Sequence, residues 1–172
     1  WATKLEEVGA HVVYGVVGYK THAKALLIVR REEGGLKRYA HLGTGNYHPR
    51  TARLYTDFGL MTANDEVTRD VSEVFKQLTG LGQARTLKHL WQAPFTLHPN
   101  VVAGIQAEAE IARNGGKARI VAKMNSLVEP EVIDAMTAAT MRSKVALSIN
   151  LTGGVFVNQS AAYSDYHGTG GN

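Results

Sequence analysis

Cysteine is absent from this chain of 172 residues, which excludes disulfide bonds and thiolate metal sites. The lack of disulfides favours a reducing compartment. No apolar run reaches about 18 residues, so a transmembrane helix is not expected. The N-terminal sequence WATKLEEVGA has neither the layout of a signal peptide nor an initiator Met, which suggests a fragment or a processed chain.

Hydrophobic residues make up 44% of the chain, enough for a packed core in one domain or in parts of two small ones. The net charge is only +4, but it is unevenly distributed. Between positions 20 and 53, eight basic residues face two acidic ones, Glu32 and Glu33; the basic ones are Lys20, Lys24, Arg30, Arg31, Lys37, Arg38, Arg50 and Arg53. Such an excess attracts phosphate, nucleic acid or acidic metabolites, although a solvated face of a hairpin is the commoner explanation of a charge cluster.

The first half of the chain reads as strands followed by a helix. β-branched and apolar residues predict strands over 11–17, 22–31 and 36–42, the last two joined by the turn EEGG, and a further short extended segment within 51–63. Ala25 to Val29 form an unbroken apolar run, which predicts a strand covered on both faces. The loop GTGNYHPR follows the hairpin, and a helix runs from a cap at Asn64 to Gly80.

The second half alternates between helices and strands. The pattern predicts helices over 99–113 and 130–142 and strands over 117–125 and 144–151, an order typical of a parallel sheet. We therefore expect two partial domains, residues 1–84 and 99–172, joined by a connector over 85–98. The tail after residue 151 is small, polar and atypical.

The stretch THAK carries the first chemical signal. On a strand, His22 and Lys24 project from the same face, and a neighbouring cation favours the neutral imidazole with a lone pair free to attack. A lone histidine is more often structural or solvated. A metal site fits less well, since His22, His41 and His48 lack helical i, i+4 spacing.

The loop GTGN carries the second signal. It comprises Gly43, Thr44, Gly45 and Asn46, and it follows the strand that pairs with the THAK strand. Its glycines let backbone N–H groups approach an anion, and Asn46 adds an amide donor. Together the two stretches predict a site in which His22 attacks phosphorus while Lys24 and the loop hold the oxygens.

His-x-Lys followed by Gly-Thr-x-Asn resembles a half-site of the phospholipase D superfamily, although Val29 stands where that family places an Asp. The stretches YGVVGYKTHAKALLIVRREE, RYAHLGTGNYHPRTARLYTDFGLMTA and ARIVAKMNSLVEPEVIDAM resemble bacterial polyphosphate kinases of the phospholipase D-like class. The likeness covers roughly residues 1–150 and implies an α/β fold with phospholipase D-like mixed sheets flanked by helices.

The resemblance implies a phosphotransferase that passes the ATP γ-phosphate reversibly to polyphosphate through a phosphohistidine. His22 matches the phosphorylated residue, and Tyr55 matches an aromatic residue that stacks on the nucleotide base. Arg50 and Arg53 lie just before Tyr55 and are candidate polyphosphate contacts, because guanidinium groups suit phosphate oxygens, although simple surface exposure explains either arginine equally well. The resemblance further implies Mg²⁺ with ATP or ADP, a homo-oligomer, no specific nucleic acid, and a cytoplasmic location at the periphery of the inner membrane.

The resemblance weakens after residue 150. The family enzymes are several times longer, Thr152 stands near an expected Arg, and the surroundings of His167 do not match a second essential His. The activity of the isolated chain is therefore left open. A phospholipase D-like phosphodiesterase or nuclease and a non-catalytic polyanion-binding module remain alternatives. Lys117, Arg119 and Lys123 alternate along one strand, where they would line a polyanion channel or face water.

Overall fold

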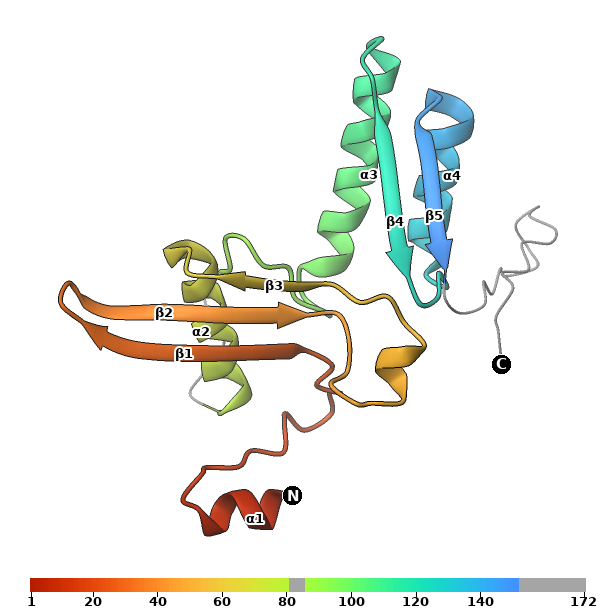
Figure 1. Ribbon diagram of the computed structural model, residues 1–172. Helices are drawn as coiled ribbons and strands as arrows, with labels where there is room; N and C mark the ends of the chain where they lie inside the picture. The colour runs from red at the N-terminus through yellow and green to blue at the C-terminus, as the bar shows by residue number, and fades with distance from the viewer. Residues whose placement is uncertain (81–85, 152–172) are drawn as a thin grey trace. The chain divides into compact units, whose positions relative to one another are not determined.

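The computed structural model describes residues 1–80 and 86–151, and Figure 1 shows its helices and strands. The chain divides into two units, Trp1–Leu90 and Trp91–Asn172, each described below by itself. The first unit contains α1 (Ala2–Glu7), β1 (Lys24–Glu32), β2 (Gly35–Gly43), the 3₁₀ helix η1 (Thr51–Arg53), β3 (Gly59–Thr62) and α2 (Asp65–Leu78); the second contains α3 (Leu97–Arg113), β4 (Arg119–Met124), α4 (Pro130–Ser143) and β5 (Ala146–Leu151). The predicted α/β class is confirmed.

The first unit is built on a three-stranded antiparallel sheet in the order β1-β2-β3. β1 and β2 form the predicted hairpin, with Glu32 opposite Gly35 and Glu33 and Gly34 between them in the turn. Gly35 has φ of +115°, which favours glycine at that turn. The short extended segment expected after the loop is β3.

α2 begins at the predicted cap, because the Asn64 side chain accepts hydrogen bonds from the backbone N–H groups of Glu66 and Val67. Its buried residues include Val71, and the helix packs against β1 and β2, where Ala40 is buried. At the helix N-terminus, Lys37 Nζ of β2 donates to Asp65 Oδ1 at 2.9 Å. This hydrogen bond raises the pKa of Lys37 and lowers the pKa of Asp65 from their ordinary values.

The prediction that Ala25–Val29 is covered on both faces is wrong. Within residues 1–80 and 86–151, β1 lies at the edge of the sheet, and α2 packs against one of its two faces. On the opposite face Leu26 and Ile28 are 52% and 46% exposed. An unbroken apolar run does not distinguish a central strand from an edge strand that presents an open apolar face.

The prediction of a strand over residues 11–17 is also wrong, because this segment has no regular secondary structure. Tyr14 and Val17 are largely exposed. Extended backbone is stabilised by hydrogen bonds to a neighbouring strand, and no strand of the described residues pairs with this segment. High β propensity alone did not produce a strand here.

The second unit is a two-stranded parallel sheet, β4-β5, with α3 and α4 behind it (Figure 1). Its core includes Ile105 of α3, Met136 and Ala139 of α4, and Val145 before β5. The predicted elements are present, with α3 beginning two residues earlier than expected, at Leu97. Thr152 and His167 lie outside the described residues. Within the described ranges, none of the helices has the length and apolar character needed to cross a bilayer.

The segment after the first gap returns to α2 and is held there by a buried carboxylate. Asp70 is 5% exposed, and its Oδ2 accepts hydrogen bonds from the backbone N–H groups of Lys88, His89 and Leu90 at 2.8, 2.6 and 3.1 Å. One helical turn earlier, Glu66 accepts a hydrogen bond from the His89 ring at 2.8 Å. This bond lowers the pKa of Glu66, and Lys88 adds to the effect. We call residues 88–90 the latch segment.

Candidate functional site

Three strands end or begin together at one end of the first sheet, which we call the site end. Lys24 opens β1 and pairs with Gly43 at the end of β2, and Gly43 pairs with Gly59 at the start of β3. Figure 1 shows the starts of β1 and β3 beside the end of β2. This row brings together the segment before Lys24, the loop after Gly43 and the segment before Gly59. The sequence reasoning expected the first two of these at one end.

His22 lies just before β1 rather than on it, so it does not share a strand face with Lys24 as expected. The two side chains nevertheless meet, because Lys24 Nζ lies 3.2 Å from both His22 ring nitrogens. It also donates to the His22 carbonyl oxygen at 3.1 Å. The contact therefore sets a cationic group beside the imidazole ring. His22 is exposed, which leaves its ring accessible from solvent.

The GTGN loop is fastened to Asp57, which precedes β3. The Thr44 hydroxyl donates to Asp57 Oδ1 at 3.0 Å and accepts from the Phe58 backbone N–H at 2.9 Å. The Thr44 backbone N–H donates to the Phe58 carbonyl oxygen at 3.0 Å. A Cβ added to Gly45 would lie 2.2 Å from Asp57 Oδ2, so this position has no room for a side chain. The sequence reasoning missed Asp57, whose signal was its place two residues after Tyr55.

Asn46 and His48 shape the rest of the loop. The Asn46 carbonyl oxygen accepts from the His48 backbone N–H at 2.8 Å, and His48 Nδ1 accepts from the Arg50 backbone N–H at 3.3 Å. Arg50 immediately precedes η1, Arg53 is its last residue, and both are exposed. Tyr55 follows η1, lies in no strand and is 40% exposed, so its ring is available to a planar partner.

His41 lies over the paired glycines of the site end. Cβ atoms added to Gly43 and Gly59 would lie 3.5 and 3.1 Å from its ring, so the two glycines make room for the imidazole. Its Nε2 hydrogen bonds to Tyr47 Oη, and the two rings meet edge to face. Its Nδ1 is buried and has no hydrogen-bond partner within the described residues. His41 therefore links the loop to the sheet.

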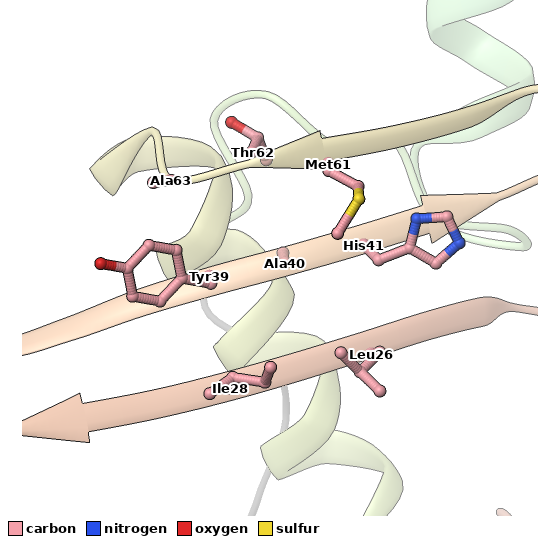
Figure 2. Close-up of a pocket in the computed structure, with 8 residues that line it drawn as sticks. All are labelled: Leu26, Ile28, Tyr39, Ala40, His41, Met61, Thr62 and Ala63. Atoms are coloured by element: carbon pink, nitrogen blue, oxygen red, sulfur yellow. The ribbon is translucent and has the colours of Figure 1, made fainter.

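An apolar cavity of about 260 Å³ lies on the open face of the sheet, opposite α2 (Figure 2). Its lining includes Leu26, Ile28 and Met61, and Tyr39 and His41 stand on the same face. Tyr39 Oη donates to Glu32 at 2.8 Å, which raises the pKa of Tyr39. This lining is apolar and so unlike the polar site end. No cluster of three metal-ligating side chains occurs in residues 1–80 and 86–151.

The chain matches two domain models of one protein family. "Polyphosphate kinase C-terminal domain 1" matches residues 1–84, and "Polyphosphate kinase C-terminal domain 2" matches residues 90–158. The chain belongs to the polyphosphate kinase family. It is 65% identical to a polyphosphate kinase of Burkholderia vietnamiensis over 144 residues, which is 81% of this chain and 21% of that protein. It is 69% identical to one of Paraburkholderia phytofirmans over 137 residues, 77% of this chain and 20% of that protein.

A solved structure of a polyphosphate kinase from Porphyromonas gingivalis has a similar fold. The TM-score is 0.80 at 29% sequence identity, covering 91% of this chain and 26% of that chain. The present chain thus spans about a fifth of the length of the curated polyphosphate kinases that it matches. The α/β fold and the family that the sequence motifs implied are both confirmed.

Proposed function

We propose that this chain carries the phosphohistidine site of an ATP:polyphosphate phosphotransferase. The observation that supports it is the row of Lys24, Gly43 and Gly59, which places His22 and the GTGN loop at one end of one sheet. The contact between Lys24 and His22 adds a cation beside the nucleophile. Membership of the polyphosphate kinase family supports ATP or ADP and polyphosphate as the substrates in this proposal.

In the proposed reaction a ring nitrogen of His22 attacks the γ-phosphorus of ATP. The N–P bond forms as the bond from phosphorus to the bridging oxygen breaks, and ADP leaves with that oxygen. The terminal oxygen of a polyphosphate chain then attacks the same phosphorus, and the N–P bond breaks. Because Lys24 Nζ lies beside the ring nitrogens, it must move off them before attack. The Lys24 ammonium group then contacts the phosphoryl oxygens and offsets their negative charge.

Other residues have supporting roles in the proposal. Tyr55 stacks on the base, and Arg50 and Arg53 contact phosphates with their guanidinium groups. Gly43, Thr44, Gly45 and Asn46 shape the loop around the phosphoryl group. Mg²⁺ normally enters such reactions bound to nucleotide phosphates and one or two carboxylates, and Asp57 offers a carboxylate at the loop. A homo-oligomer in the cytoplasm, at the periphery of the inner membrane, completes the proposal.

Phosphorylation of the purified chain tests this function. The chain is incubated with γ-labelled ATP and Mg²⁺, and in parallel with phosphoramidate, a small donor that needs no nucleotide site. We expect an acid-labile, base-stable label on His22 that is abolished in His22→Ala. His11→Ala removes another exposed histidine of the same unit and should leave the label unchanged. Equal labelling of wild type and His22→Ala, or no label on His22 from either donor, would refute the proposal.

A further inference from the structure

One face of the sheet of the second unit packs on helices, and no described helix or strand covers the other, which we call the open face. Ile120, Ala122 and Met124 of β4 pack against the core formed with α3 and α4. Alternate residues point the other way, and the register pairs them across the two strands. The open face therefore carries Arg119, Val121 and Lys123 of β4 beside Ala146, Ser148 and Asn150 of β5.

Charge is divided between the two sides of this unit. The five carboxylates within residues 91–151 are Glu108, Glu110, Glu129, Glu131 and Asp134, and all lie on α3, on α4 or at the residue before α4. Several are already engaged. Glu110 pairs with Arg113, Glu129 and Glu131 lie beside the His98 ring, and Glu108 accepts from the Arg119 backbone N–H.

Among the described residues of β4 and β5, the charged side chains on the open face are Arg119 and Lys123, both positive. Arg119 and Lys123 are exposed, and neither forms an ion pair with a described residue. Ser148 lies opposite Val121 and Asn150 lies opposite Lys123, so a hydroxyl and an amide stand beside the cations. Val121, which is 66% exposed, separates the two charges with an uncharged aliphatic surface. Arg119 and Lys123 lie four residues apart on a strand, or about 13 Å.

We propose that this open face binds inorganic polyphosphate as an extended chain. Arg119 holds one phosphate with its guanidinium fork, Lys123 holds another further along, and Asn150 and Ser148 donate to oxygens between them. Polyphosphate carries negative charge on every unit, so one chain reaches both cations. Pyrophosphate is too short to bridge about 13 Å. The choice of polyphosphate rather than another polyanion rests on the function proposed above. The arrangement of the two cations on the open face is independent of that function.

The test measures binding of medium-length polyphosphate to the 172-residue chain by calorimetry over a range of salt concentrations. Arg119→Gln/Lys123→Gln removes both cations of the open face. Arg142→Gln/Lys4→Gln removes the same charge from exposed helix positions and serves as the matched control. We expect the first variant to bind on the order of tenfold more weakly, with a salt slope lowered by about 1.4 for two lost contacts, and the control to change by less than about twofold.

Two further measurements sharpen the result. Arg119→Lys/Lys123→Arg keeps both charges and should retain most of the affinity, which separates loss of charge from loss of folding. Pyrophosphate is too short to contact both cations at once, so its affinity should fall less than that of polyphosphate in Arg119→Gln/Lys123→Gln. Equal weakening of the two charge-removing variants would overturn the proposal. The assignment to polyphosphate would likewise fail if single-stranded DNA bound as tightly with the same dependence on Arg119 and Lys123.

This outcome is distinguishable from that of the labelling experiment. Polyphosphate binding to the open face does not require His22, so His22→Ala should retain the difference between the variants. A missing label with an intact difference would refute the kinase site and leave the binding face standing. A label on His22, together with equal polyphosphate binding by the two charge-removing variants, would support the kinase site and refute the binding face.

Discussion

Removing the Asp70 carboxylate should release the latch segment and destabilise the first unit. One buried carboxylate oxygen accepts three backbone N–H groups, at 2.8, 2.6 and 3.1 Å. A net contribution of about 1.5–3 kcal/mol is typical of one hydrogen bond to a charged group. Three bonds that share one oxygen are worth less than three separate ones, and water can solvate the freed N–H groups once the segment detaches. We therefore expect Asp70→Ala to lower the free energy of unfolding by about 3–4 kcal/mol.

Asp70→Asn should fall between wild type and Asp70→Ala. The amide oxygen can still accept, but neutral hydrogen bonds are roughly half as strong as charge-assisted ones, so the loss should be about 1.5–2 kcal/mol. Urea denaturation followed by circular dichroism measures the free energies. Hydrogen exchange at the amides of Lys88, His89 and Leu90 reports directly on the latch segment, and these amides should exchange faster in both variants.

Asp134→Ala is the matched control, because Asp134 is exposed on α4 and makes no hydrogen bond or ion pair with a described residue. It should change the free energy of unfolding by no more than about 0.5 kcal/mol. The reasoning is refuted if Asp70→Ala costs no more than Asp134→Ala, or if exchange in the latch segment is unaltered. Either result would mean that the three hydrogen bonds do not hold residues 88–90 on α2.

Two other predictions concern the site end and the ion pair at the start of α2. Gly45→Ala places a Cβ 2.2 Å from Asp57 Oδ2, so the loop must shift and labelling of His22 should fall about tenfold to a hundredfold. Gly34→Ala has nothing within 4 Å of its added Cβ and should be labelled like wild type. Equal labelling of the two variants would contradict the role of the loop. The pKa of Asp65 is lowered and that of Lys37 is raised, so their pair stabilises between the ordinary values of 3.8 and 10.5. The stability difference between wild type and Asp65→Asn should therefore be present near pH 7, shrink as the pH falls below about 3.8, and shrink again as the pH rises above about 10.5. Urea denaturation midpoints of both proteins across this pH range measure the difference. A difference that does not change with pH would count against the ion pair.

Local signals predicted most of the fold. The cap at Asn64 and the glycine-containing turn each act over a few residues, and both α2 and the β1–β2 hairpin formed where expected. Strand–helix alternation over 117–151 likewise predicted the parallel pair β4-β5. The prediction of a strand over residues 11–17 failed because a strand requires a hydrogen-bonded partner, which β propensity alone does not provide. The exposure of β1 depends on what covers its second face, which its own residues do not encode.

Contacts between distant segments were beyond sequence reasoning. The pairing of Thr44 with Asp57 joins residues 13 apart, and the latch segment joins Asp70 to N–H groups 18 to 20 residues later. The site end itself was partly predictable, because the register of the predicted hairpin places Lys24 opposite Gly43. Nothing in the local pattern indicates that a third segment brings a carboxylate to the same loop.

The edge position of β1 has a practical consequence for handling this protein. Its nine residues pair only with β2 among the described segments, so a row of backbone N–H and C=O groups faces outward beside exposed Leu26 and Ile28. Such an edge can template intermolecular strand addition and precipitation. Lys24 at one end and the Arg30–Arg31 pair at the other act as gatekeepers, since stacking two copies in register would bring like charges together. Salt screens that repulsion, so concentrated samples should keep best at low ionic strength.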